Sequence, residues 1–486
     1  MIDYGQFFSH DFMAFLYIIN LIIAFVIIFL ERKNPSATLA WLLLLFVLPG
    51  AGILLYLILS QNIARQKIYK FSDNEKRVIS EELDKQAEEI KEGTYPFASE
   101  SAGQWSDLIR LNQVYGNSFL TQNNRIEVFT DGKEMLEKMV HDIQHATVSV
   151  NVMTYIIKDD KVGRAFIDVL TEKAREGVEV RLLMDALGSR MINDRKLRDF
   201  IAAGGKTAYF FKPKFKLINL KLNYRNHRKI TVIDGRKGYI GGFNIAKEYL
   251  GLKRKFGYWR DTHIKITGGA VQDLNARFVL DWRYASGEPV ELSQVYFGEP
   301  KSDGHSPVQI LSSGPNSSRE EIKRGMMKMI TSAQDYIFLQ TPYFIPDPSM
   351  LESLKMAAQS GVDVRIMIPS MPDHMFVYWA TYSYCGELIK SGARVYIYDG
   401  GFLHAKTLVV DGEVATVGSA NFDRRSFKLN FESNAIIYDE QVAERMTEIF
   451  KEDIKRGHEL TLQGYNERNI IIKFKEAVSR LLSDIL

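Results

Sequence analysis

The sequence predicts an α/β protein in which one mixed-sheet unit occurs twice, preceded by a hairpin of two hydrophobic helices. Three observations lead to this prediction. A polar motif recurs at one constant offset of 177 residues, from 227 to 404, strand and helix patterns alternate around each copy, and two long apolar runs lie near the N-terminus. Strand–helix–strand alternation is typical of mixed or parallel sheets that are covered by helices.

The two apolar runs, Phe12–Leu30 and Thr38–Leu59, contain 19 and 22 residues without a charge. At about 1.5 Å per helical residue, each is long enough to cross the roughly 30 Å hydrocarbon layer of a membrane. We therefore expect a transmembrane hairpin, with a buried helical hairpin as the alternative. Pro49–Gly52 is expected to kink the second helix or to make it re-entrant.

Lys and Arg are more frequent after the second run than in the loop between the runs. This bias predicts that the rest of the chain lies on the cytoplasmic side of the cell membrane, as part of a multi-pass protein. The predicted regions are a transmembrane hairpin over 1–65 (spans about 12–30 and 38–59), a charged helix and linker over 66–120, a first repeat over 121–295 and a second over 296–486.

The repeated motif is a candidate site for phosphoryl chemistry. Its copies contain His227, Lys229, Asp234 and Asn244, and His404, Lys406, Asp411 and Asn421. Residues two apart on a strand lie on the same face, so each His and its Lys are expected to point the same way. A His can act as a nucleophile or as a general acid and base, whereas a Lys and an Asn can stabilise the phosphate oxygens.

This doubled His-x-Lys-x4-Asp motif with a downstream Asn resembles the mark of the phospholipase D superfamily, and within it the chain is similar to bacterial cardiolipin synthases over nearly its whole length. The resemblance implies two phospholipase D-like mixed-sheet sandwich domains packed as a pseudo-twofold. It also implies that His227 is the nucleophile and His404 the general acid and base. The symmetry of the motif leaves the reverse assignment open.

The resemblance further implies that acidic groups hold the histidines, with Glu432 serving the second half and Asp261 the first. Asp234 and Asp411 belong to the motif and are candidates for a catalytic role. Each precedes a Gly at a predicted hairpin turn, however, and Asp commonly binds backbone amides at such turns. A structural role is therefore favoured for these two.

The expected activity is that of a membrane phosphatidyltransferase, which joins two phosphatidylglycerol molecules into cardiolipin and releases glycerol through a phosphohistidine. A phospholipase D-type hydrolase that uses water and a non-catalytic membrane scaffold are the alternatives. We expect no cofactor, and no metal because the Lys would place an ammonium beside the ion. The expected partners are phospholipid substrates and the bilayer. A net charge of only +3 argues against nucleic acid, and the oligomeric state stays open.

Three further features lie outside the motif. Basic and aromatic residues alternate over 211–216 and 253–260, which predicts either contact with an anionic membrane surface or ordinary solvated loops. The single cysteine, Cys385, is expected to be a small buried residue. A C-terminal helix is predicted to cap the core, in preference to lying on a membrane, from the apolar positions Ile470, Phe474, Val478, Leu481 and Ile485.

Overall fold

The computed structural model describes residues 10–31, 35–59, 68–69, 71–212, 223–290, 304–481 and 483. The chain forms two units. One contains Met1–Arg65 and Pro213–Tyr224, and the other contains Gln66–Lys212 and Arg225–Leu486.

The N-terminal unit consists of short helical elements, which are α1 (His10–Phe25), the π-helical η2 (Val26–Glu31), α2 (Pro35–Val47) and α3 (Ala51–Leu59). Pro49 and Gly50 separate α2 from α3, because proline has no amide to donate and Gly50 has a φ of 91°. Within the described residues, none of the helices combines the length and the apolar character needed to cross a membrane. The predicted transmembrane hairpin over 12–30 and 38–59 is therefore not supported, since each run is divided between shorter elements.

Large apolar side chains cover the outside of this small unit. Ile27, Leu45 and Tyr56 form its buried core. Outside this core, eleven large apolar side chains among the described residues of this unit are more than half exposed, namely Phe15, Ile18, Leu21, Ile22, Phe25, Phe29, Leu39, Leu43, Phe46, Val47 and Leu54. An apolar exterior of this extent marks a surface that meets something other than water. The residues behind the predicted orientation, such as Arg32, Lys33 and Arg65, lie outside the described residues.

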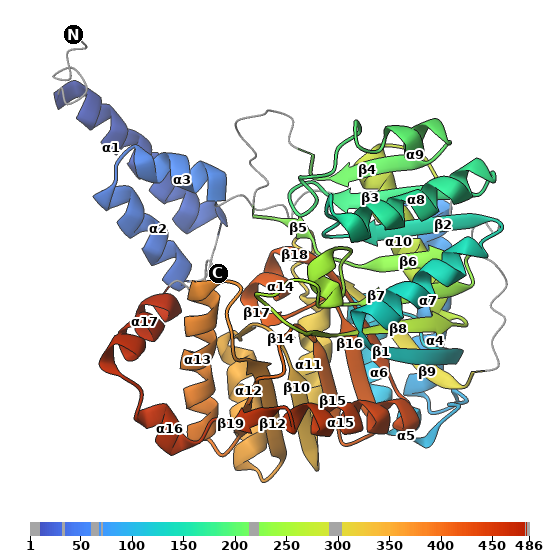
Figure 1. Cartoon of the computed structure of the whole chain (residues 1–486). Helices are drawn as coiled ribbons and strands as arrows, with labels where there is room; N and C mark the ends of the chain where they lie inside the picture. The colour runs from blue at the N-terminus through green and yellow to red at the C-terminus, as the bar shows by residue number, and fades with distance from the viewer. Residues whose placement is uncertain are drawn as a thin grey trace. The chain divides into compact units, whose positions relative to one another are not determined.

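The larger unit contains two mixed sheets of the same topology (Figure 1). In the first sheet the strands follow the order β1–β8–β7–β6–β2–β3–β4, and β2, β3 and β4 are parallel. Their bounds are β1 (Thr121–Asp131), β2 (Ser149–Thr154), β3 (Glu179–Asp185), β4 (Lys206–Phe210), β6 (Ile230–Ile233), β7 (Lys237–Gly241) and β8 (Trp259–Thr267).

The second sheet repeats this order as β9–β18–β16–β15–β10–β12–β13, and β19 extends it at the far edge. Antiparallel pairing of β1 with β9 joins the two sheets. The bounds are β9 (Ser306–Ser313), β10 (Tyr336–Gln340), β12 (Asp363–Pro369), β13 (Arg394–Tyr398), β15 (Thr407–Val410), β16 (Val414–Gly418), β18 (Asn430–Ile437) and β19 (Gly457–Glu459). The α/β fold with mixed sheets is thus confirmed.

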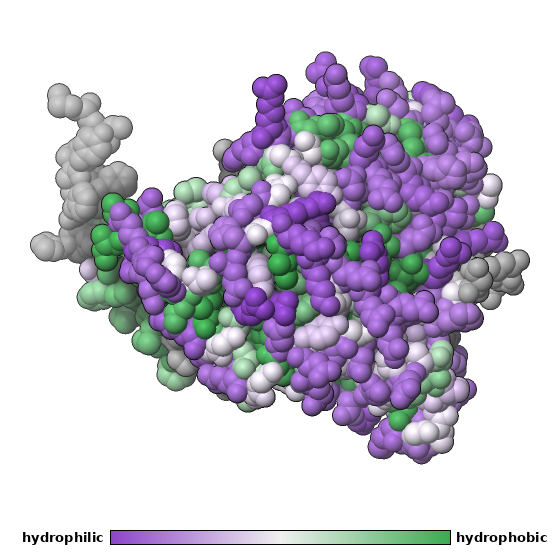
Figure 2. Space-filling view, turned by 60° about the horizontal axis from the view of Figure 1, so that its bottom comes forward, coloured by the Kyte–Doolittle hydropathy of each residue, from purple (hydrophilic) through white to green (hydrophobic). Residues whose placement is uncertain are grey.

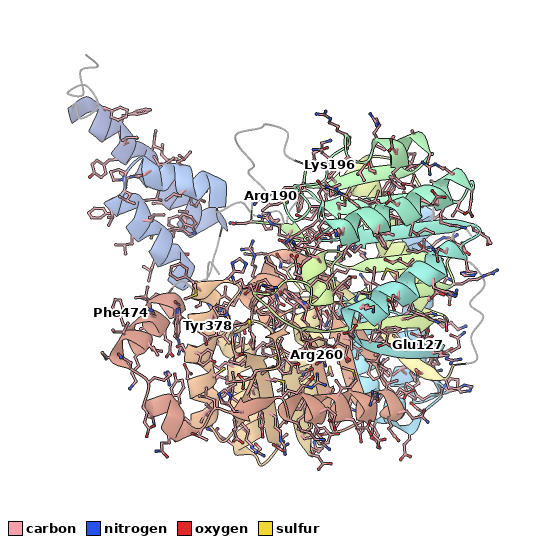
Figure 3. All side chains as sticks on the ribbon, viewed as in Figure 1. Glu127, Arg190, Lys196, Arg260, Tyr378 and Phe474 are labelled. Atoms are coloured by element: carbon pink, nitrogen blue, oxygen red, sulfur yellow. The ribbon has the colours of Figure 1, made fainter. Side chains whose placement is uncertain are left out.

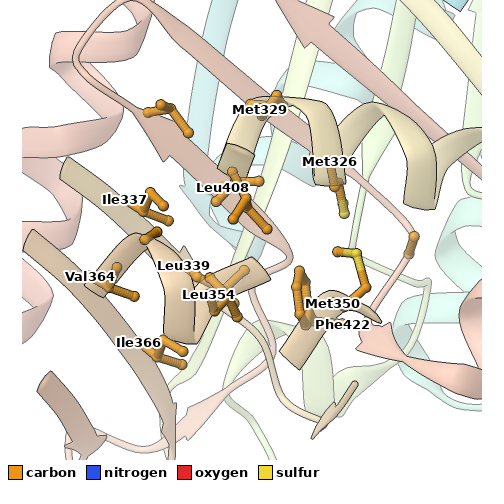
Figure 4. Close-up of a cluster of buried hydrophobic side chains, with 14 of the residues drawn as sticks. Met326, Met329, Ile337, Leu339, Met350, Leu354, Val364, Ile366, Leu408 and Phe422 are labelled. Carbon is orange, nitrogen blue, oxygen red and sulfur yellow. The ribbon is translucent and has the colours of Figure 1, made fainter. Parts of the chain in front are cut away.

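Helices cover the sheets and connect the parallel strands. They are α4 (Asp73–Lys91), α5 (Glu100–Gln104), α6 (Ser106–Gly116), α7 (Gly132–Gln144), α8 (Lys161–Arg175), α9 (Arg198–Ala202), α10 (Ala270–Ser286), α11 (Glu321–Ser332), α12 (Pro348–Gln359), α13 (Met375–Lys390), α14 (Arg424–Lys428), α15 (Glu440–Ile454), α16 (Leu462–Asn466) and α17 (Ile470–Leu481). Figure 4 shows how α11 and α12 close the core of the second half, where Met329 and Leu354 pack with Ile337, Leu339 and Leu408 of the sheet. This close packing makes the sheet a rigid support for the functional residues.

Two very short strands connect the halves. β5 (Arg225–Asn226) pairs in parallel with β18 of the second half, and β14 (Phe402–Leu403) pairs in parallel with β8 of the first. Each of these short strands leads directly into one copy of the motif. The segment before each motif histidine is therefore part of the opposite half's sheet.

Asp234 and Asp411 lie at the turns of the β6–β7 and β15–β16 hairpins, both with positive φ values of 52° and 54°. The Asp234 carboxylate accepts hydrogen bonds from the amides of residues 147–149 at 2.8–3.2 Å. The Asp411 carboxylate accepts from the amides of residues 334–336 at 2.7–2.9 Å. Both carboxylates thus tie a turn to the start of the neighbouring strand. This geometry supports the structural role favoured for both residues, and a catalytic role for them stays a prediction.

We expect Asp411→Ala to lower the free energy of unfolding by about 3 kcal/mol, because it removes a charged acceptor of three amides and places Ala at a positive φ. Turnover of the protein that remains folded should stay within a few-fold of the wild type. Asp411→Asn, which tolerates the φ value, should cost less. Denaturant unfolding and an activity assay measure both quantities. A thousandfold loss of turnover at unchanged stability would support a catalytic role.

Candidate active site

The two motif histidines are held by carboxylates of the opposite half. Nδ1 of His227 lies 3.0 and 3.1 Å from the two carboxylate oxygens of Glu432. Nδ1 of His404 lies 2.5 Å from Oδ2 of Asp261. The expected pairing within each half, of Glu432 with His404 and of Asp261 with His227, is therefore wrong.

The crossed pairing follows from the short strands β5 and β14. The amide of His227 donates to the carbonyl of Phe431 at 2.9 Å, which brings His227 beside Glu432. The amide of His404 donates to the carbonyl of Arg260 at 2.7 Å, which brings His404 beside Asp261. Arg260 itself lies in the interior of the larger unit (Figure 3).

Both carboxylates are fully buried, and additional donors hold them. Ser419 Oγ donates to Glu432 at 2.5 Å and Asn430 Nδ2 donates at 3.2 Å. Asp261 accepts from the amide of Thr262 at 2.8 Å. Ser419 and Asn430 were not anticipated, although Ser419 lies inside the repeated motif, where it takes the place of Gly242.

The two lysines lie beside their own histidines, as the strand pattern predicts. The ammonium of Lys229 donates to the carbonyl of His227, and that of Lys406 donates to the carbonyl of His404. Lys406 Nζ also lies 3.0 Å from Nδ1 of His404. The ring of Tyr155 lies 4.8 Å from that of His227 and 5.3 Å from the ammonium of Lys229, so it closes one side of the first half-site.

Asn244 and Asn421 follow the returning strands of the two hairpins and are both buried. Oδ1 of Asn244 accepts from the amide of Ile156 at 3.0 Å, which orients its NH2 group. Oδ1 of Asn421 is buried without a hydrogen-bond partner among the described residues. The two amide groups are thus in different environments, because the oxygen of Asn244 has a backbone donor and that of Asn421 has none among the described residues.

Burial and charge set the protonation of the site. Burial lowers the pKa of His227 to about 4, although Glu432 opposes the shift, and it also lowers the pKa of His404. Burial lowers the pKa of Lys229 to about 7 and that of Lys406 below its usual value. Burial alone would raise the pKa of Glu432, but the contacts with His227, Lys229 and Ser419 together outweigh burial and hold the pKa of this carboxylate below its usual value. In the resting site both imidazoles are therefore neutral at pH 7.

The two half-sites form one electrostatic unit. The charge of Lys406 lowers the pKa of His227, and the charge of Lys229 lowers that of His404. Such mutual effects require that both halves contribute to the same buried space. The carboxylates contact the Nδ1 atoms, so Nε2 of each imidazole remains available for chemistry. The site therefore offers two imidazoles, together with two cations that can bind an anionic group.

Arg228, between His227 and Lys229, was not anticipated as a positioning residue. Its guanidinium is fully buried and pairs with Asp281 at 2.8 Å. It also donates to the carbonyl of Glu432 at 3.1 Å and to the hydroxyl of Tyr69 at 3.2 Å. The ion pair therefore fixes the backbone on both sides of the His227–Glu432 contact.

The remaining sequence features contribute to the walls of the site or to the core. Trp259, from the basic-aromatic stretch 253–260, is buried with its ring 5.1 Å from that of His404. Most of the stretch 211–216 and Lys221 lie outside the described residues. Cys385 is fully buried, as predicted, and burial raises the pKa of its thiol. Across the described part of the chain, no three His, Cys, Asp or Glu side chains are grouped to hold a metal ion.

Gly242 provides a test of how the carboxylate positions the histidine. A Cβ at this position would collide with Oδ1 of Asp261, which Thr262 and His404 hold in place. We expect Gly242→Ala to displace Asp261 and to reduce kcat by about 10–100-fold, the usual cost of losing a positioning group. A matched control is Ser419→Ala, which removes a hydrogen bond to Glu432 without adding a collision.

Steady-state kinetics and the thermal midpoint would be measured for both variants. Full activity of a folded Gly242→Ala enzyme would contradict a positioning role for Asp261.

The pKa values predict a pH profile for kcat/KM. Lys229 must be cationic to bind a phosphodiester, and with a pKa of about 7 it loses its charge as the pH rises, so kcat/KM should fall above about pH 7. His227, which the family resemblance implies to be the nucleophile, must be neutral to attack, and a pKa of about 4 predicts an acid limb near pH 4. A bound anion raises the pKa of Lys229, so kcat should persist to higher pH than kcat/KM.

Lys229→Arg, which keeps its charge, should move the basic limb upward. An unchanged basic limb in this variant would show that another group sets it.

Three comparisons place this geometry among known proteins. The family profile described as "cardiolipin synthase, PLD-like domain" matches residues 139–282 and 326–454, and one described as "phospholipase D-nuclease N-terminal" matches residues 18–61. The chain is 48% identical over 475 residues to a cardiolipin synthase of Listeria monocytogenes, with 98% of each chain covered. It is 46% identical over 476 residues to the major cardiolipin synthase of Bacillus subtilis, again with 98% of each chain covered.

Among solved structures, a phosphatidylserine synthase of Haemophilus influenzae superposes with a TM-score of 0.59 at 16% sequence identity. That superposition covers 77% of this chain and 96% of the other and shows a shared fold.

Proposed function

The chain belongs to the cardiolipin synthase family of phospholipase D-like enzymes, and we propose that its crossed His–carboxylate pairs carry out the reaction of this family. It is a phosphatidyltransferase that joins two phosphatidylglycerol molecules into cardiolipin and releases glycerol. The observation that supports the proposed site is the pair of neutral imidazoles, each with its own ionised carboxylate, in one buried space with two lysines.

In the proposed first step, Nε2 of His227 attacks the phosphorus of the donor lipid. Nδ1–H of the same ring donates to Glu432, which stabilises the positive charge that forms on the imidazole. Binding of the phosphodiester anion favours a protonated His404, and Nε2–H of this imidazolium protonates the departing glycerol oxygen. The product of this step is a phosphatidyl group bonded to His227, together with free glycerol.

In the second step, His404 removes the proton from a hydroxyl of the second phosphatidylglycerol. The hydroxyl oxygen attacks the phosphorus, the bond to His227 breaks and cardiolipin forms. Lys229 and Lys406 neutralise the non-bridging oxygens in both transition states, and Asn244 and Asn421 donate to the same atoms. The Lys406 ammonium beside His404 favours proton release from this ring, which suits it to the acid role.

We further propose that the apolar exterior of the N-terminal unit holds the enzyme at the bilayer, where both substrates are. The exposure of side chains such as Phe15, Leu21 and Phe46 supports this location.

The products of the reaction distinguish a synthase from a hydrolase, which would use water instead of a second lipid as the acceptor. For a synthase, labelled phosphatidylglycerol should yield cardiolipin and glycerol in excess of phosphatidic acid. Phosphatidic acid as the sole product would favour the hydrolase.

A donor with a good leaving group separates the roles of the two histidines. A phosphatidyl ester of p-nitrophenol needs no general acid, so His404→Ala should still release p-nitrophenolate in a single burst and accumulate a covalent phosphatidyl enzyme. His227→Ala should release none. With phosphatidylglycerol, both variants should lose at least about three orders of magnitude in turnover. A burst from His227→Ala and none from His404→Ala would reverse the assignment.

Removal of residues 1–64 tests the membrane location. The shortened chain should keep its activity on detergent-dispersed phosphatidylglycerol but produce much less cardiolipin on vesicles, because the acceptor lipid is no longer concentrated near the site. The ratio of cardiolipin to phosphatidic acid is the measurement. Equal cardiolipin yield on vesicles from both chains would contradict the proposed anchoring.

A further inference from the structure

The C-terminal helix α17 (Ile470–Leu481) turns two polar side chains inward and four large apolar side chains outward. Glu476 and Ser479 are buried. Ile470, Phe474 and Leu481 are 75%, 69% and 83% exposed, and Ile471 is 59% exposed. The helix was predicted to cap the core through Ile470, Phe474, Val478, Leu481 and Ile485. That prediction is wrong for Ile470, Phe474 and Leu481, whereas Val478 is partly buried and Ile485 lies outside the described residues.

Specific contacts hold α17 in this orientation. The carboxylate of Glu476 forms a bidentate pair with Arg468 at 2.7 and 2.8 Å. Beyond the end of the helix, the hydroxyl of Ser483 accepts a hydrogen bond from Tyr384 of α13 at 3.1 Å. A rotation of α17 that buried its apolar side chains would break these contacts and expose the carboxylate partner of Arg468. The outward position of Phe474 is therefore fixed by the protein itself.

The same outward region carries positive charge. Lys473 and Lys475 are exposed, and Glu476, the single acidic residue of α17, points inward and is paired. The ammonium of Lys475 lies 5.4 Å from the ring centre of Trp379, which joins this face to α13. At its first turn α13 exposes Met375 and Phe376 by 53% and 55%.

This combination of apolar and basic side chains is exposed on the larger unit. Hydrophilic side chains dominate the face shown in Figure 2, and Phe474 lies at the outer edge of the larger unit in Figure 3. Large apolar side chains flanked by lysines are typical of helices that lie in the interface of an anionic membrane, where the apolar side enters the acyl boundary and the cations meet the headgroups.

We propose that the outward face of α17, with Ile470, Ile471, Phe474 and Leu481 as its apolar stripe and Lys473 and Lys475 as its cations, docks on an anionic bilayer surface. The choice of a bilayer over a protein partner follows from the charge of the face, which complements anionic headgroups. The choice of phosphatidylglycerol as the headgroup lipid rests on the proposed function. This contact is separate from the N-terminal unit and holds the catalytic unit against the surface that contains both substrates.

A fluorescent probe at position 474 tests the docking directly in the full chain. Phe474→Cys provides the attachment site for an environment-sensitive dye, and Met356→Cys on α12, where Met356 is 64% exposed, is the matched control. The native Cys385 is fully buried and does not compete for the dye. Both labelled proteins are reconstituted in vesicles of phosphatidylglycerol and, separately, of phosphatidylcholine, each with and without a spin-labelled lipid as quencher.

We expect the dye at position 474 to shift to the blue in phosphatidylglycerol vesicles and to be quenched by the spin-labelled lipid at least twice as strongly as the dye at position 356. In phosphatidylcholine vesicles, or with Lys473→Glu and Lys475→Glu added, the difference should disappear. Equal quenching at both positions in phosphatidylglycerol vesicles overturns the proposal. A blue shift without lipid quenching also overturns it, because the stripe is then covered by protein, from this chain or a second copy.

The rate of cardiolipin formation tests whether the docking matters for function. Ile470→Ser with Phe474→Ser should lower cardiolipin formation on vesicles at least fivefold and leave it unchanged on detergent-dispersed phosphatidylglycerol, where no surface has to be found. Met356→Ser is the control and should change neither. Equal turnover of the double variant on vesicles overturns the proposal. An inactive wild type would contradict the proposed function instead, and the quenching result would still decide the docking.

Discussion

The site depends on one structural constraint, the crossed strand pairing that carries each histidine into the sheet of the opposite half. β5 adds to β18 and β14 adds to β8, so neither half contains a complete His–carboxylate pair of its own. A single half would hold an imidazole without its acceptor and a buried carboxylate without its donor. Such unpaired buried groups are costly, which makes the assembly of the two halves and the assembly of the site the same event.

Burial disfavours the charged form of every ionisable group in this space, so it lowers the pKa of the bases and raises that of the acids. The contacts decide between these tendencies: Asp261 and Glu432 stay ionised because they face the histidines and lysines. The result is a resting site with two neutral imidazoles beside two ionised acids. An incoming phosphodiester anion neutralises the charges of Lys229 and Lys406, so the binding of the phosphodiester and its activation for attack are coupled.

Much of this arrangement was accessible from the sequence, and the limits have physical reasons. The repeat at one constant offset predicts two equivalent sheets, and the strand period correctly places each Lys beside its His. The Asp-Gly turns predict the amide contacts of Asp234 and Asp411, because turn chemistry is local. The crossed pairing was missed because it depends on two-residue strands whose partners are distant in the sequence: Arg225 pairs with Asn430, and Phe402 pairs with Trp259.

The predictions that the structure does not support lie at the two ends of the chain and share a cause. Hydrophobicity alone predicts that apolar residues either span a membrane or enter the core. The N-terminal runs are instead divided by Pro49–Gly50 and by a π-helical segment, and α17 turns its apolar stripe outward because Glu476 has a partner inside. In both places a specific backbone or polar contact outweighs the hydrophobic pattern, and such contacts are visible only in three dimensions.

The central claim is that Glu432 serves His227 and Asp261 serves His404. Nuclear magnetic resonance of protein labelled with 15N in histidine tests it most directly, because a proton shared between Nδ1 and a carboxylate is strongly deshielded. Two such protons are expected in the wild type, assigned through His227→Ala and His404→Ala. Asp261→Asn should remove the signal of His404 and leave that of His227, and Glu432→Gln should do the reverse. Loss of the His227 signal in Asp261→Asn, with that of His404 retained, would contradict the crossed site.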